Sequence, residues 1–85
     1  MHHQDWLMLL ALYKHKNITK TAEELYISQP ALTSRIKRME DFFRTQMISR
    51  NNRGVQFTME GELLVEKARE MIRTYDDIQA ELDNL

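Results

Sequence analysis

The first part of the chain has apolar residues at the spacing of a helix that is buried along one face. In residues 4–15, Trp6, Leu9, Leu10 and Tyr13 follow the i, i+3, i+4, i+7 pattern of such a face. Other apolar residues lie between these four positions, so we expect the helix to be covered on more than one side. The pattern therefore predicts a central helix enclosed by the next two helices and by a partner.

The last part of the chain carries a more regular pattern. Residues 59–83 predict one long helix, for which Thr58 supplies the N-cap hydroxyl. Apolar residues recur in it at alternating steps of four and three, which is the heptad seam of a helix that packs against another helix. The seam consists of Leu64, Ala68, Met71, Tyr75, Ile78, Leu82 and Leu85. Such a helix extends about 40 Å at about 1.5 Å per residue, which is longer than so small a domain needs.

We interpret this seam as a surface for self-association. The alternatives are that the seam packs against the chain's own first helix or against a further domain. Tyr75 favours a loose or an antiparallel pair, because tyrosine is unusual in a tight parallel two-stranded coil. The direction of the pair stays open at this point.

Two shorter helices are predicted between these segments. The first spans residues 20–26, with Thr19 as its N-cap and the small Ala22 turned inward, where it lets the next helix cross closely. A tight turn ends at Ser28, which can cap the next helix, and Pro30 falls in the first turn, where a missing N–H costs little.

The third helix, which runs to about residue 43, has two different faces. Its apolar face consists of Ala31, Leu32, Ile36, Met39 and Phe43. The other face offers amide, hydroxyl and ammonium groups, and it consists of Gln29, Pro30, Thr33, Ser34 and Lys37. A helix that buries one face and offers such groups on the other suits the DNA major groove. There Gln29 can form two hydrogen bonds with adenine, and Thr33 can contact a thymine methyl group or a base edge.

Residues 47–50 and 55–58 predict two short strands around the turn Asn51–Gly54, where Asn and Gly supply the positive φ values of a hairpin. A hairpin after these helices is the layout of a winged helix-turn-helix. Arg53 lies at the tip of this wing, and we expect it to enter the adjacent minor groove, where A·T-rich sequence deepens the negative potential.

The charge distribution supports an anionic partner, although the net charge is only −1. Residues 28–58 carry a local balance of +4, and residues 59–85 carry −5, so the middle of the chain is expected to face the anion. Arg50 either binds a phosphate or pairs with Glu40 or Asp41. Arg38 is expected to contact phosphate or solvent rather than bases.

Other chemistries lack supporting residues. The 85 residues are 42% hydrophobic and make one small domain, and the absence of cysteine fits a reducing cytoplasm. No apolar run is long enough to span a membrane. The histidines have no carboxylate or thiolate at ligand spacing, and no nucleophile has a base beside it, so we expect no metal, no cofactor and no enzyme activity.

Sequence-specific binding to double-stranded DNA is the function that these features favour. The candidate DNA-contacting residues are Thr19, Ser28, Gln29, Pro30, Thr33, Ser34, Lys37, Arg38, Arg50 and Arg53. A winged-helix protein-interaction module is the main alternative, against which the cationic middle segment argues. A purely structural dimerisation domain would leave the polar face of the third helix without a role.

Two segments resemble LysR-type transcriptional regulators in their N-terminal DNA-binding region. NITKTAEELYISQPALTSRIKRME, residues 17–40, is similar to the helix-turn-helix of that family, and SRNNRGVQFTMEGE, residues 49–62, is similar to its wing and the start of its linker helix. The resemblance implies an all-α fold with a small β-hairpin wing. It divides the chain into a winged helix-turn-helix domain over residues 1–58 and a linker helix for dimerisation over residues 59–85.

The resemblance also implies how the protein acts. It implies a homodimer with antiparallel linker helices, bound in the bacterial cytoplasm to promoter DNA at a partly dyad-symmetric, A·T-rich site. Gln29, Pro30, Thr33 and Ser34 match positions that contact bases and backbone, and Arg53 matches a minor-groove arginine. A larger C-terminal domain that binds a small-molecule effector is usual in the family, so we expect this chain to be a fragment.

Two positions depart from the family pattern. Arg44 stands where glycine is usual, which leaves the end of the third helix uncertain. Ser34 stands where a longer basic or aromatic residue is common, which favours an altered sequence preference.

Overall fold

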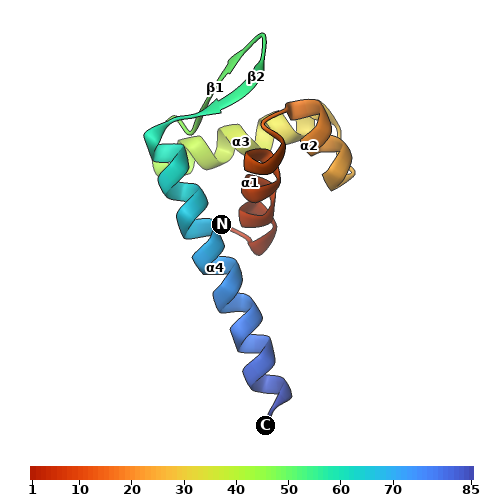
Figure 1. Ribbon diagram of the computed structural model, residues 1–85, viewed down its shortest axis with the longest axis vertical. Helices are drawn as coiled ribbons and strands as arrows, with labels where there is room; N and C mark the ends of the chain where they lie inside the picture. Colours follow the sequence, from red (N-terminus) through yellow and green to blue (C-terminus); the bar gives the residue numbers. More distant parts are fainter.

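The computed structural model describes residues 1–85 as four helices and one two-stranded antiparallel sheet (Figure 1). The elements are α1 (His3–His15), α2 (Ile18–Leu25), α3 (Gln29–Phe43), β1 (Ile48–Asn51), β2 (Gly54–Phe57) and α4 (Met59–Asp83). The first three helices pack together, the hairpin stands beyond α3, and α4 packs against α1 before its second half extends past the other helices, so that the molecule measures 50 × 26 × 19 Å. This confirms the predicted all-α fold with a β-hairpin wing. No helix combines the length and hydropathy that a membrane span needs.

The core is built around α1. Its residues Met8, Leu9 and Leu12 are fully buried, whereas Leu7 is 41% exposed. The other elements contribute to the same core with Ala22, Leu32, Ile36, Met39, Met47, Ile48, Val55, Val65 and Ala68. As expected, α1 is therefore covered on more than one side, by α2, α3 and α4.

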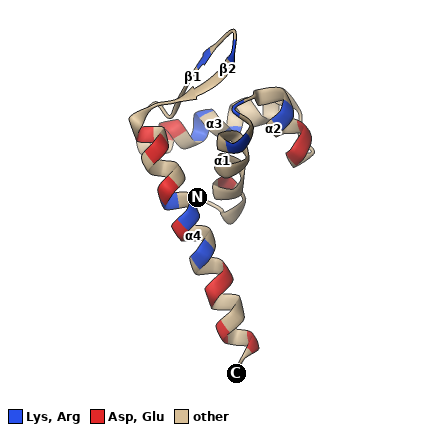
Figure 2. Cartoon of the chain, viewed as in Figure 1, with Lys and Arg blue, Asp and Glu red and all other residues tan.

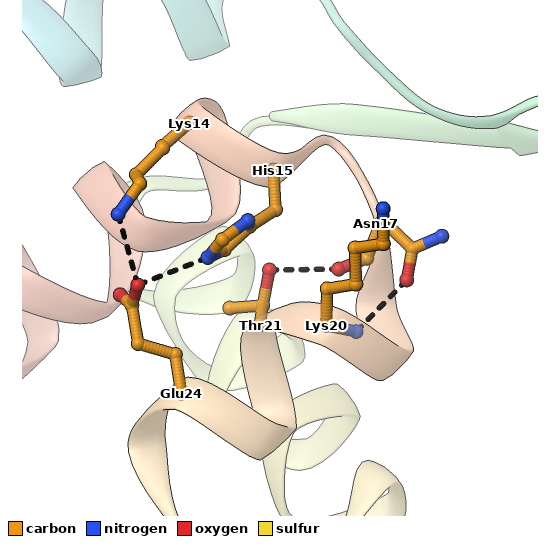
Figure 3. A network of polar contacts seen from close by, with 6 residues as sticks. All are labelled: Lys14, His15, Asn17, Lys20, Thr21 and Glu24. Carbon is orange, nitrogen blue, oxygen red and sulfur yellow. Dashed lines mark hydrogen bonds and ion pairs between the residues drawn. The ribbon is translucent and has the colours of Figure 1, made fainter.

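The corner between α1 and α2 shows that the predicted start of the second helix was wrong. Asn17, not Thr19, is the N-cap, because its extended backbone turns its side-chain oxygen onto the N–H of Lys20 at 2.9 Å (Figure 3). The hydroxyl of Thr21 donates to the carbonyl oxygen of Asn17 at 2.7 Å, which holds the cap in place. Thr19 therefore lies within the first turn of α2 and is exposed.

The limits of α3 agree with the prediction. The Ser28 hydroxyl accepts the N–H of Ala31 at 3.2 Å, and Pro30 occupies the first turn. Arg44 has a left-handed conformation, with φ 52°, directly after Phe43, and the Thr45 N–H bonds the carbonyl of Glu40. The arginine thus occupies the position where helices commonly end on glycine, and the helix stops in the same way.

The wing is shifted by one residue from its predicted limits, and one reason given for its turn was wrong. Ile48 pairs with Phe57 and Asn51 pairs with Gly54. Gly54 has a φ of 119°, but neither asparagine has a positive φ. Instead, the side-chain oxygen of Asn51 accepts the N–H of Arg53 at 2.8 Å, which closes the turn from within.

The first half of α4 belongs to the core, and the second half extends past it. Thr58 caps the helix as predicted, and its hydroxyl accepts the N–H of Gly61 at 3.0 Å. A side chain at Gly61 would overlap the carbonyl oxygen of Met47, so this glycine allows the helix to approach the wing. Val65 and Ala68 are buried, whereas every residue after Ile72 is exposed.

Candidate nucleic-acid interface

The polar residues predicted on α3 lie on one open face of the helix. Gln29, Pro30, Ser34 and Lys37 are exposed, and Thr33 is half-buried at the edge of this face. They are exposed because α3 buries the opposite stripe, Leu32, Ile36 and Met39, against the core. The structure therefore brings together the five residues that were predicted to form the polar face of this helix.

The wing contacts this face through Arg50. Its guanidinium donates to the hydroxyl of Thr33 at 3.2 Å, which joins β1 to α3. The predicted alternative, an ion pair of Arg50 with Glu40 or Asp41, was wrong, because both carboxylates have other partners. Glu40 accepts the backbone N–H of Met47 at 2.8 Å. Asp41 pairs with Lys37 at 3.2 Å.

The Thr33–Arg50 contact affects what the threonine can offer. Its oxygen accepts a hydrogen bond from Arg50, and its own O–H is left to donate to another group. A donor in the major groove recognises N7 or O6 of guanine, N7 of adenine or O4 of thymine, and it does not recognise the amino group of cytosine.

Arg53 lies at the turn of the hairpin and is exposed. Figure 1 shows that the hairpin projects past α3, with its turn at the far end. Both charged residues of the wing are cations, as Figure 2 shows, and beyond Arg73 all the charged residues of α4 are anions. The cationic wing and the acidic end of α4 point in opposite directions, which places the positive potential beside α3.

The remaining candidates are distributed around this face. Ser28 caps α3, and Arg38 is exposed one position beyond Lys37. Neither Arg38 nor Gln29 makes a side-chain hydrogen bond or ion pair within the chain, so both are available to a ligand.

Sequence reasoning missed the residues that hold the wing. Tyr13, near the end of α1, contacts both the wing and the beginning of α4, and Lys16, the C-cap of that helix, contacts the wing. The signal that was present is the pair of glycines, the only two in the chain, since each marks a close backbone approach. The local sequence does not show which backbone segment lies close to each glycine.

The fold and the site define a winged helix-turn-helix protein. It has two helices joined by a capped tight turn, an exposed polar face on the second helix and a cationic hairpin after it. The chain belongs to the bacterial regulatory helix-turn-helix proteins of the lysR family, whose model matches residues 3–62. The matched residues are the helix-turn-helix part of that family.

Curated relatives agree with this assignment. The chain is 39% identical over all 85 residues to the uncharacterized HTH-type transcriptional regulator YraN of Bacillus subtilis. It is 36% identical over 73 residues, 86% of the chain, to the DNA-binding transcriptional dual regulator OxyR of Escherichia coli. It spans 29% of the length of the first and 24% of the second.

Solved structures share the fold. The DNA-binding domain of BenM in a complex with catB site 1 DNA has a TM-score of 0.90 at 25% identity, over 99% of this chain and 94% of that one. The DNA-binding domain of CbnR in its DNA complex has a TM-score of 0.83 at 24% identity, over 96% of this chain and 99% of that one. At 24% identity, the similarity to CbnR shows the fold alone.

Proposed function

We propose that this chain is the DNA-binding part of a transcriptional regulator and that it binds operator DNA as a homodimer. The observation that carries the proposal is the open face of α3, with Gln29 and Thr33, beside a wing whose charged residues are both cations. Relatives that are regulators, and a related domain whose structure is a DNA complex, support it.

In this proposal α3 lies in the major groove and the wing in the adjacent minor groove. Gln29 and Thr33 contact base edges, and Arg53 contacts the narrow minor groove of A·T-rich flanks. The free N–H groups at the start of α3, next to Ser28, favour a phosphate. Thr19, Pro30, Ser34, Lys37, Arg38 and Arg50 complete the proposed contact set.

The proposed dimer forms through the outer half of α4. Of the seam residues, Leu64 is half-buried and Ala68 fully buried in the chain's own core, so both support α4 from within the protomer. Five seam residues remain open: Leu85, which follows the end of the helix, is 99% exposed, and the four within α4, Met71, Tyr75, Ile78 and Leu82, are 41–57% exposed. We propose that a second copy covers these four in an antiparallel pair. In this proposal the boundary at residue 58 divides a DNA-binding part from a dimerising part, although the first half of α4 packs in the same core as the residues before it.

The rest of the proposal concerns the longer protein. Because the chain spans less than a third of its curated relatives, the part that senses a signal is expected outside it. A small-molecule effector would bind that part, and the whole protein would act on promoter DNA in the bacterial cytoplasm.

The experiment is selection from a random duplex DNA library at two salt concentrations, with Arg53→Ala selected in parallel. Enrichment of a dyad-symmetric site is expected. The logarithm of the binding constant should fall linearly with the logarithm of the salt concentration, with a slope of about −0.9 per phosphate contact. Arg53→Ala should keep the half-sites and lose the A·T-rich flanks. A pool without enrichment and without salt dependence would favour the alternative, a winged-helix protein-interaction module.

A further inference from the structure

The wing is attached to the corner between α1 and α2 through backbone atoms. The N–H of Val55 donates to the carbonyl oxygen of Lys16 at 2.9 Å. A Cβ on Gly54 would lie 2.5 Å from that same oxygen, so only glycine lets β2 approach so closely. Lys16 ends α1 in a left-handed conformation, with φ 49°, which turns its carbonyl group toward the wing.

Side chains strengthen this attachment. The ring of Tyr13 meets the ring of Phe57, the last residue of β2, edge to face, with centroids 4.9 Å apart. The ammonium group of Lys16 lies 3.8 Å from the centroid of the Tyr13 ring, and it also donates to the carbonyl oxygen of Tyr13 at 2.9 Å. A cation over an aromatic ring and an edge-to-face pair each add stabilisation beyond buried area.

The same tyrosine also contacts α4. Its hydroxyl donates to Glu62 at 2.8 Å, and the guanidinium of Arg69 lies 5.6 Å from its ring centroid. The hydrogen bond to Glu62 raises the pKa of Tyr13, so the hydroxyl keeps its proton across the neutral range. Tyr13 is therefore joined to the wing through its ring and to α4 through its hydroxyl.

A two-stranded hairpin has little stability without such support. Each strand of the wing is four residues long, so a small tilt at its base displaces Arg53 at its tip. We propose that Tyr13 and Lys16 are positioning residues that fix the wing relative to α4, so that the placement of α4 determines how well Arg53 reaches the DNA. The inference rests on the proposed function, because it concerns the wing's contact with DNA.

The test measures DNA affinity on two duplexes that share the selected half-sites and differ only in A·T-rich or G·C-rich flanks. Tyr13→Phe keeps the ring and removes the bond to Glu62, and Lys16→Met keeps the alkyl chain and removes the cation. Each variant is expected to reduce the preference for A·T-rich flanks roughly two- to tenfold. The ratio of the two affinities is independent of the folded fraction, so a general loss of stability does not change it.

The matched control is Tyr26→Phe, because Tyr26 is 95% exposed and its hydroxyl has no partner. It should leave the ratio unchanged. In a double-mutant cycle, Tyr13→Phe should have no further effect on the ratio once Arg53 is alanine. An unchanged ratio in Tyr13→Phe and Lys16→Met, or equal losses with and without Arg53, would overturn the inference.

Hydrogen exchange of the free protein separates this inference from the proposed function. The amide of Val55 should exchange faster in Tyr13→Phe and Lys16→Met than in Tyr26→Phe. If the wild-type chain bound no DNA, the proposed function would fail, and unchanged Val55 exchange would independently refute the anchoring. If the wild type prefers A·T-rich flanks through Arg53 and the variants do so equally, the positioning role alone is wrong.

Discussion

Single side chains set the corner between α1 and α2, and Glu24 is the clearest case. One of its oxygens accepts from His15 at 3.0 Å and from Lys14 at 3.1 Å (Figure 3). The bond to His15, followed by the bond to Lys14, lowers the pKa of Glu24. A lowered carboxyl pKa stabilises the folded state above the unfolded value of about 4.3, and this contribution disappears as pH falls through the folded value.

We therefore predict that Glu24→Gln lowers the melting temperature at pH 7 and that the difference from wild type shrinks as the pH falls below the unfolded value of about 4.3. Glu23→Gln is the control, since that neighbour is exposed and has no side-chain partner. Thermal unfolding of the three proteins across this pH range provides the measurement. A deficit that is equally large at pH 3 would show that the carboxylate charge is not responsible.

Gln29 gives a residue-scale prediction for DNA recognition. Replacing it with alanine should relax the choice at one base pair in each half-site, at a loss of about 1–3 kcal/mol of discrimination. Competition binding against all four bases at each position measures this. Gln4→Ala, which removes an exposed glutamine from α1, is the matched control. A Gln29→Ala profile identical to that of the control would remove Gln29 from the base-reading set.

At the scale of elements, the sequence predicted the type and order of every helix and strand. Ser28 and Thr58 were assigned correctly as caps because each has the only suitable hydroxyl before its helix. Asn17 and Thr19 are both good caps, and the choice between them depends on tertiary packing. Thr21 is fully buried and bonds back to Asn17, which fixes the earlier start. No local pattern contains that information.

The junction between the wing and α4 gives a prediction at this scale. Thr58 accepts the N–H of Gly61, and its hydroxyl lies 2.6 Å from the carbonyl oxygen of Gln46 and 3.1 Å from that of Met47. Thr58→Ala removes a cap and a link to the residues before β1, so it should cost about 2 kcal/mol, the upper end for a cap.

Urea unfolding measures that cost, and Thr74→Ala is the control. Thr74 is exposed in the middle of α4, where its hydroxyl bonds the carbonyl oxygen of Glu70. Alanine is the better helix former there, so the control should be neutral or slightly stabilising. Equal unfolding midpoints for the two variants would show that the junction is not fixed by Thr58.

At the scale of the whole molecule, the apolar seam of α4 is covered by the chain in its first part and exposed in its second, a division that the sequence pattern does not show. α1 has 13 residues and α4 has 25, so at about 1.5 Å per residue α4 is roughly 18 Å longer than α1. Ala68 is covered within the chain, whereas Met71 and the later seam residues are not. The candidate DNA-reading face was predictable because it is local to α3. The extent of intramolecular cover depends on how α1 lies against α4, which sequence spacing leaves open.

The exposed half of the seam leads to the last prediction. Ile78→Asp puts a charge where a second copy would bury an isoleucine, and Ala80→Asp puts the same charge in the same turn but away from the seam. Burying an unpaired carboxylate is costly, so Ile78→Asp should weaken self-association by about 100-fold or more while Ala80→Asp leaves it intact. Sedimentation across a concentration series measures the dimer, and circular dichroism shows whether the monomer stays folded. Both variants should fold, since neither position belongs to the core.

Because two linked half-sites bind more tightly than one, Ile78→Asp should also lose affinity for the palindromic operator and keep its affinity for a single half-site. A dimer that survives Ile78→Asp, or that Ala80→Asp disrupts equally, would place the contact elsewhere on the chain.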